Sequence, residues 1–209
     1  MAGINPLMLS IFGSSYSAIS ALVKSYGYAA IFGLMLLEGS SLPVPSEVVM
    51  PLAGLFSHQG LLSFYAALGA GLLGSVGGLA IDYYIGYFFG KDVIYKHLRT
   101  FHVKKESLDS FDTWFARNGD VAVFVSRLVP VIRTFMSFPA GFARMDQRRF
   151  FAYSIAGTFI WDAVLMAFGF YALSSRSAVL ILISVAAFAI VIYVVYYLSM
   201  KSMGKHRNG

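Results

Sequence analysis

Residues 177–200 form an uninterrupted run of 24 residues without a charged side chain. A helix needs about 20 apolar residues to cross the hydrocarbon core of a bilayer, so this run predicts a transmembrane helix. Residues 150–173 and 61–90 are similarly apolar, and each contains one charge, Asp162 and Asp82 respectively. A helix satisfies its own backbone hydrogen bonds, as lipid requires. The sequence therefore predicts an all-α membrane protein in which these three segments span.

Composition agrees with this class. Only 12% of the residues are charged, whereas an ordinary soluble domain has about 25%, so most of the surface is expected to face lipid. The net charge of +6 does not indicate nucleic-acid binding, because the basic residues are not interleaved with aromatic residues on a soluble module. The absence of cysteine excludes disulfides, thiolate nucleophiles and cysteine-ligated metals. Neither a metal nor a cofactor is predicted.

Two further apolar segments, residues 26–56 and 121–143, are interrupted by proline. The prolines are Pro43, Pro45 and Pro51 in the first segment and Pro130 and Pro139 in the second. Proline removes a backbone donor and clashes with the preceding turn, so neither segment is expected to form one straight helix. Each half is too short to cross a bilayer, and irregular backbone at membrane depth survives only where protein or a wet cavity shields it. Both segments are predicted to be re-entrant hairpins.

The distribution of basic residues predicts the orientation. Lysine and arginine are enriched on the cytoplasmic side of membrane proteins, so the basic residues after position 200 place the C-terminus in the cytoplasm. Counting the spans back from this end places Arg148, Arg149 and the charged segment 91–120 in the cytoplasm as well. The first hairpin then enters the membrane from outside and the second from the cytoplasm.

Opposed hairpins are the geometry of an inverted repeat, which in transporters places the substrate site near the midplane between the repeats. A shift of 87 positions superposes Pro43 on Pro130 and Ala53–Gly54 on Ala140–Gly141, and supports the repeat weakly. The expected architecture is a single integral membrane domain with about three to four transmembrane helices. Whether residues 1–25 span the membrane or lie on its outer surface stays open.

The charged segment 91–120 allows two interpretations. Leu108, Phe111, Trp114 and Phe115 recur at helical spacing between charged residues, which predicts an amphipathic helix lying on the membrane surface. Gly119 is expected to end that helix. A simple solvated connector is the alternative.

Six charged residues lie within the apolar segments. They are Glu38, Glu47, Asp82, Arg127, Arg133 and Asp162. A charge at the bilayer centre costs about 2.5–3.5 kcal/mol on insertion scales, so such residues are functional candidates. The guanidinium group binds phosphate through parallel donors, whereas a buried carboxyl group can exchange a proton near neutral pH.

Glu38 and Glu47 flank the first break, and Arg127 and Arg133 flank Pro130. We expect the two arginines to bind a substrate anion and the two glutamates to couple transport to protons. The alternative is that buried salt bridges only hold the hairpins together, although buried ion pairs are weak evidence of stability. Asp82 and Asp162 either support this site or only pair with an arginine or face a wet cavity.

These residues resemble the motifs of the DedA family, also called the SNARE-associated or VTT-domain family. The motifs are Glu38…Pro43-Val-Pro45-Ser-Glu47…Ala53-Gly54, Phe124-x-x-Arg127-x-x-Pro130-x-x-Arg133-Thr134…Ala140-Gly141, and Gly157-x-x-x-Trp161 followed by Gly169-Phe-Tyr171. They cover residues 26–173 with order and spacing intact. Many members carry an acid next to the position of Gly78, whereas here the acid is Asp82, which leaves the role of Asp82 open.

The resemblance implies a multi-pass protein of a bacterial or archaeal cytoplasmic membrane with two opposed re-entrant hairpins. It implies a flippase for a polyprenyl phosphate such as undecaprenyl phosphate, coupled to the proton motive force, in which Glu38, Glu47, Arg127 and Arg133 are needed for activity. The alternatives are a phospholipid scramblase on the same fold and a small-ion transporter coupled to protons. Sodium is an alternative coupling ion, and a homo-oligomer stays open.

Catalysis is not expected. A membrane lipid phosphatase needs a nucleophile with a supporting acid or base beside its arginines. The four histidines, His58, His97, His102 and His206, all lie outside the apolar segments that carry Arg127 and Arg133.

Overall fold

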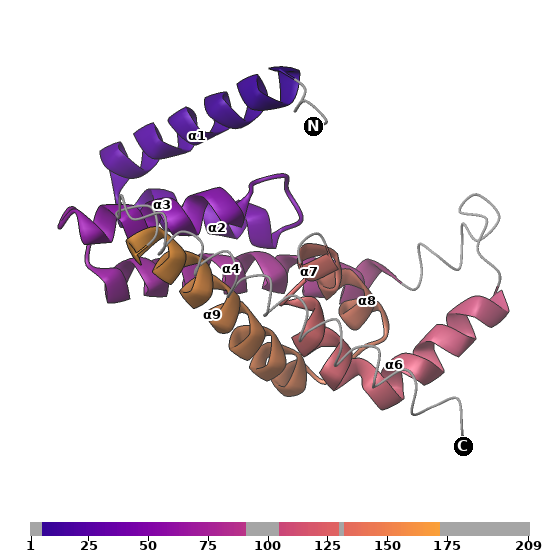
Figure 1. Ribbon diagram of the computed structural model, residues 1–209. Coiled ribbons are helices and arrows are strands. Elements are labelled where there is room, and N and C mark those ends of the chain that lie inside the picture. The colour runs from indigo at the N-terminus through magenta and orange to yellow at the C-terminus, as the bar shows by residue number, and fades with distance from the viewer. Residues whose placement is uncertain (1–5, 91–104, 130–131, 172–209) are drawn as a thin grey trace.

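The computed structural model describes residues 6–90, 105–129 and 132–171 (Figure 1). The regular elements of this part are all helical. They are α1 (Pro6–Tyr26), α2 (Tyr28–Gly39), α3 (Ser46–His58), α4 (Phe64–Ile85), the π-helical turn η1 (Gly86–Gly90), α6 (Lys105–Ser126), α7 (Ile132–Phe135), α8 (Ser137–Phe142) and α9 (Gln147–Tyr171). The predicted span 177–200, the basic C-terminal tail and Pro130 lie outside the described residues.

Two helices of the described part are long and apolar enough to cross a membrane. They cover residues 64–89, which join α4 to η1, and residues 147–171, which form α9. They run antiparallel, because Phe64 contacts Phe170 at one end, with ring centroids 5.7 Å apart, and Tyr83 stacks on Phe150 at the other, 4.3 Å apart. Both agree with the predicted segments 61–90 and 150–173 within a few residues.

The first proline-containing segment folds as two short helices whose outer ends meet at the start of α4. Tyr28 at the start of α2 accepts a hydrogen bond from the backbone N–H of Ser63 through its hydroxyl oxygen, at 2.8 Å. The chain returns to this end through α3, which ends at His58. Helices of 12 and 13 residues are about 18–20 Å long, shorter than the hydrocarbon core of about 30 Å.

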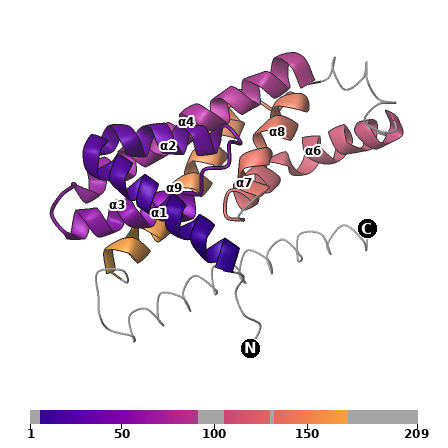
Figure 2. The same cartoon turned by 90° about the horizontal axis from the view of Figure 1, so that it is seen from above.

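The second proline-containing segment lies at the opposite end of the antiparallel pair. The Tyr83 hydroxyl near the end of α4 donates a hydrogen bond of 2.5 Å to the carbonyl of Met145, just before α9 begins. Arg149 at the start of α9 forms an ion pair with Asp120 of α6, with Nη1 and Oδ2 3.6 Å apart. The two broken segments therefore approach the middle of the α4–α9 pair from opposite ends, and Figure 2 shows α3 and α8 beside different ends of α4.

The second arm of each broken segment packs on the long helix that follows the other segment. A Cβ at Gly54 of α3 would collide with the carbonyl of Met166 and lie 2.8 Å from the nitrogen of Phe170, both in α9. A Cβ at Gly141 of α8 would collide with the carbonyl of Tyr83 and lie 2.8 Å from the nitrogen of Tyr87. Each glycine thus allows two helix backbones to come into contact. Gly54 and Gly141, which the 87-residue shift superposes, therefore have the same packing role.

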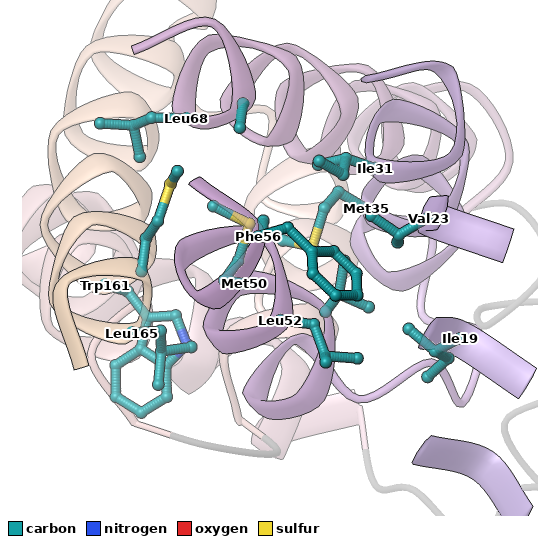
Figure 3. Close-up of a cluster of buried hydrophobic side chains, with 14 residues drawn as sticks. Ile19, Val23, Ile31, Met35, Met50, Leu52, Phe56, Leu68, Trp161 and Leu165 are labelled. Carbon is teal, nitrogen blue, oxygen red and sulfur yellow. The ribbon is translucent and has the colours of Figure 1, made fainter. Parts of the chain in front are cut away.

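A hydrophobic core joins α1, α2, α3, α4 and α9 at the end where α4 begins. Its members include Ile19, Val23, Ile31, Met35, Met50, Leu52, Phe56, Leu68, Trp161 and Leu165 (Figure 3). The first arm α2 packs closely on α4, because Gly39, Gly74 and Gly78 leave room for backbone contact. This core fixes α2 and α3 against both long helices.

Two expected helix interruptions, at Gly119 and at Pro51, are absent. Helix α6 continues through Gly119, where the missing Cβ leaves space for the ring of Phe115 one turn earlier. Helix α3 continues through Pro51, whose backbone packs against Gly169 of α9. The second segment is interrupted at Met136, between α7 and α8, and Pro139 lies in the first turn of α8, where its missing N–H leaves no intrahelical bond unmade. The first segment is broken at residues 40–45 instead.

Candidate functional site

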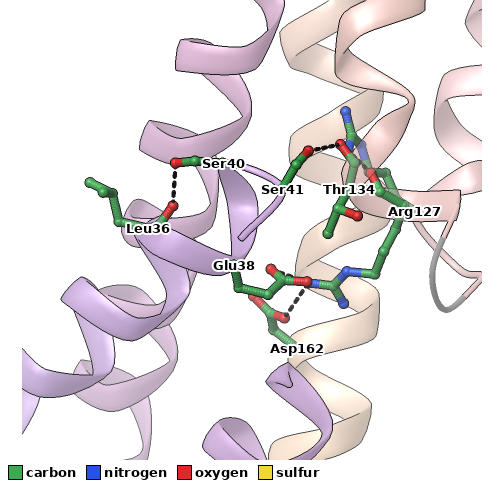
Figure 4. A network of polar contacts seen from close by, with 8 residues as sticks. Leu36, Glu38, Ser40, Ser41, Arg127, Thr134 and Asp162 are labelled. Carbon is green, nitrogen blue, oxygen red and sulfur yellow. Dashed lines mark hydrogen bonds and ion pairs between the residues drawn. The ribbon is translucent and has the colours of Figure 1, made fainter. Parts of the chain in front are cut away.

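An ion pair joins the two broken segments at the middle of the molecule. Nη2 of Arg133, at the start of α7, lies 2.9 Å from Oε2 of Glu38, at the end of α2, and both side chains are about 95% buried. Nη2 of Arg133 also lies 3.9 Å from Oδ1 of Asp162 in α9. The guanidinium lies over the ring of Trp161 at 5.5 Å, a cation–π contact. Arg133 therefore connects Glu38 of α2 with Asp162 of α9, and Figure 4 shows these two acids on the same side of the cluster.

Arg127, just after α6, has most of its donors occupied by protein groups. Its Nη2 donates to the hydroxyls of Ser137 at 3.0 Å and Ser154 at 3.1 Å, its Nε donates to Ser154 at 3.3 Å, and its Nη1 donates to the carbonyl of Arg133. Gly157 leaves room on α9 for the Arg127 side chain. Arg127 thereby positions the backbone that carries Arg133.

Arg133 keeps unused donor capacity. Within the described residues its Nη1 has no hydrogen-bond partner, and the Asp162 carboxylate approaches Arg133 only at 3.9 Å. Buried polar atoms are rarely left without a partner, and each such atom calls for an explanation. A buried guanidinium with an open nitrogen, beside a buried carboxyl group, is suited to binding an ion or a proton.

Asp82 is held by the first break rather than by an arginine. The Ser41 hydroxyl lies 2.5 Å from Oδ2 of Asp82 and 3.3 Å from the carbonyl of Thr134. Because a hydroxyl carries one hydrogen, the shorter contact is the one that Ser41 donates. Ser41 thus lies between α4 and the second segment, and Asp82 is 98% buried beside it.

The remaining predicted residues lie at the edge of this cluster. Glu47 is in the first turn of α3 and is exposed, outside the buried ion pairs of the described residues. Pro43 and Pro45 lie in the non-helical turn between α2 and α3, as their spacing predicted. The arrangement thus brings Glu38 and Asp162 to Arg133 and links Arg127 and Asp82 to this group.

Sequence reasoning missed the hydroxyl groups that hold the charges. Ser41 binds the buried carboxyl group of Asp82, and Ser137 and Ser154 bind the buried guanidinium of Arg127. Serine is common in apolar helices and carries no periodic signal of its own. Only the location of Ser41 beside the first break hinted at a role.

The sequence profile of the VTT domain matches residues 44–171. This range covers more than half of the chain and includes Arg127, Arg133, Asp82 and Asp162, while Glu38 lies just before it. The chain belongs to the VTT-domain family. The DedA resemblance of its motifs is thereby confirmed, and this VTT-domain protein is a membrane protein.

Three relatives illustrate the family. Undecaprenyl phosphate transporter A of Staphylococcus aureus is 32% identical over 198 residues, which are 91% of this chain and 97% of the relative. The alkaline phosphatase-like protein of Lactococcus lactis subsp. lactis is 29% identical over 156 residues, 72% of this chain and 73% of the relative. Protein DedA of Escherichia coli is 25% identical over 161 residues, 73% of each chain. No solved structure matches this VTT-domain protein.

Proposed function

We propose that this VTT-domain protein is a flippase that moves a polyprenyl phosphate, such as undecaprenyl phosphate, across the membrane by passing its phosphate headgroup between two re-entrant hairpins. The observation that carries the proposal is Arg133, a buried guanidinium that bridges both segments and keeps Nη1 without a partner among the described residues. Guanidinium binds phosphate through paired donors. The relative named undecaprenyl phosphate transporter A, aligned over nearly its whole length, supports this substrate class.

In this mechanism an arriving phosphate competes with Glu38 for Arg133. When the phosphate takes the place of the carboxylate at Nη2, Glu38 loses its partner in an apolar site, which favours its neutral form. Uptake of a proton by Glu38, supplied through the exposed Glu47, would couple headgroup entry to the proton gradient. Arg127 contributes positive charge to the same site and keeps Arg133 in place, and Asp162 offers Arg133 a second acid after the lipid leaves.

We do not propose catalysis, although one relative is named a phosphatase-like protein. Hydrolysis of a phosphate ester needs a nucleophile with an acid or base beside it. His58 is the one histidine among the described residues. Its ring contacts Phe170, with centroids 5.0 Å apart, at the end of the molecule where α4 begins. Arg133 lies at Trp161, more than two helical turns from Phe170 along α9.

The first test measures transport by the purified protein in liposomes, with undecaprenyl phosphate, with and without a pH gradient. Glu38→Gln removes the ion pair and the proton site, and Arg133→Ala removes the phosphate donor, so we expect each to reduce transport at least tenfold. Arg117→Gln, which removes an exposed charge on α6 away from the cluster, is the matched control and should transport normally.

The outcome also separates the alternatives. Equal movement of undecaprenyl phosphate and phosphatidylglycerol would identify a phospholipid scramblase on the same fold. Movement of neither lipid, with proton-driven uptake of a small ion, would identify an ion transporter. Normal transport by folded Arg133→Ala protein would show that the site is assigned wrongly.

A further inference from the structure

A second cluster of arginines surrounds a pocket at the end of the molecule where α9 begins. The pocket has a volume of about 590 Å³ and lies between α6, the turn after α8 and the first turn of α9. Ligand pockets of proteins are commonly about 300–1,000 Å³. Arg149 precedes Asp162 by 13 residues on α9, which is about 20 Å of helix, so this pocket is separate from the buried ion pairs.

The charges around the pocket are unevenly compensated. Arg144, Arg148 and Arg149 line it together with Asp120 and Asp146. Both acids contact Arg149. Asp120 forms the ion pair with the Arg149 side chain, and Oδ1 of Asp146 accepts a hydrogen bond of 3.0 Å from the Arg149 backbone N–H. Within the described residues no acid pairs with Arg144 or Arg148, so two guanidinium groups stay available to a ligand.

The backbone holds Arg144 in an unusual conformation. Its φ is +52°, in the left-handed region where residues with a Cβ are uncommon. The Arg144 N–H donates to the carbonyl of Gly141, and the Met145 N–H donates to the carbonyl of Ala140. The Arg144 guanidinium lies over the ring of Tyr87 at 5.5 Å. Glycine adopts this backbone conformation readily. The position nevertheless carries Arg144, whose cationic side chain lines the pocket.

The surroundings of the pocket indicate the membrane surface. Phe115 and Met145 form an apolar part of its lining. Trp114, which contacts Phe115, and Phe88, which contacts Tyr87 under Arg144, are 47% and 62% exposed. Exposed aromatic residues next to arginines are typical of segments that lie at the boundary between acyl chains and headgroups. A ligand here would meet cations and apolar side chains together.

We propose that this pocket binds the anionic headgroup of a membrane phospholipid, with Arg144 and Arg148 as ligands of its phosphate and the wall around Phe115 beside its first acyl carbons. Basic pockets beside membrane-spanning helices are suited to anionic headgroups. Binding here does not require transport, so the proposal stands or falls separately from the flippase. If both hold, the pocket concentrates anionic lipid next to the second hairpin.

The chain carries its own reporter for this site. It has two tryptophans, Trp114 beside the pocket and Trp161 at Arg133. The Trp161→Phe protein in liposomes therefore reports through Trp114 alone, and lipids with brominated acyl chains quench its fluorescence on contact. We expect brominated phosphatidylglycerol to quench it with at least a threefold preference over brominated phosphatidylcholine, and added salt to weaken that preference.

Two variants assign the preference to the pocket. The double variant Arg144→Gly with Arg148→Gln should reduce the preference for phosphatidylglycerol over phosphatidylcholine to a ratio of about one. It should still fold, because glycine adopts the left-handed conformation readily. Arg117→Gln, which removes an arginine of α6 outside the pocket lining, should keep the preference. If the Trp161→Phe protein is not monodisperse, a fluorophore attached to Asn118→Cys replaces Trp114 as the reporter. This label is specific because the natural sequence has no cysteine.

Three results would overturn the proposal. One is the absence of a preference for phosphatidylglycerol, and another is a preference that survives in the double variant. The third is loss of the preference on addition of millimolar inorganic phosphate at constant ionic strength, which would show that the pocket selects the free ion rather than the lipid.

Discussion

At the scale of single residues, Ser41 couples the first break to the buried charges. Its φ of +58° lies in the left-handed region, and its hydroxyl donates to Asp82. Ser41→Ala leaves a buried carboxylate without this donor, which costs about 1–3 kcal/mol. Ser41→Gly loses the same bond but relieves the left-handed backbone, whose cost is about 1–2 kcal/mol for a residue with a Cβ.

We therefore expect both Ser41 variants to be less stable than the wild type, with the glycine variant more stable than the alanine variant by about 1 kcal/mol. Thermal unfolding in detergent, followed by circular dichroism, measures the order. An alanine variant as stable as the wild type would show that the contact with Asp82 contributes nothing to folding.

At the scale of helices, the structure depends on two glycines: Gly54 lets α3 contact α9, and Gly141 lets α8 contact the end of α4. Gly54→Ala and Gly141→Ala place a Cβ against a helix backbone that cannot give way as a flexible side chain would. Such overpacking costs about 1–3 kcal/mol, so the melting temperature should fall in both variants by a similar amount.

Gly69→Ala is the matched control for these helix contacts. A Cβ at Gly69 in α4 meets nothing within 4 Å, so alanine should leave stability unchanged or raise it by up to about 1 kcal/mol. A fall in melting temperature for Gly69→Ala equal to that of Gly54→Ala would mean that glycine matters for helix flexibility and not for close packing.

At the scale of the whole molecule, the connections at the two ends of the α4–α9 pair should face opposite sides of the membrane. Gln59 follows α3 and Gln147 begins α9, and both are exposed. Because the chain has no cysteine, Gln59→Cys and Gln147→Cys each give a single label site. In intact cells a membrane-impermeant maleimide should label Gln59→Cys only, and Gln147→Cys should react only after the cells are opened.

This labelling pattern tests the orientation that the positive-inside rule predicts for Arg148 and Arg149. The reversed pattern would mean that the protein has the opposite orientation in the membrane with the same fold. Labelling of both sites from one side would contradict the opposed re-entrant hairpins themselves.

The sequence alone determined the parts of this protein that depend on local composition. Apolar length predicted the helices α4 and α9, and paired prolines predicted the turn between α2 and α3. The scarcity of charge singled out the five residues of the buried cluster together with the exposed Glu47, because a charge in an apolar segment is costly wherever the chain folds. The 87-residue shift paired Gly54 with Gly141 before their common role was visible.

Tertiary packing alone decided which groups touch. It paired Arg133 with Glu38 and Asp162, gave Arg127 its partners Ser137 and Ser154, and left Glu47 exposed. It also carried helices through Gly119 and Pro51, because a neighbouring ring or helix backbone used the space. These outcomes depend on the relative depth and facing of helices far apart in the sequence, which hydrophobic periodicity does not encode.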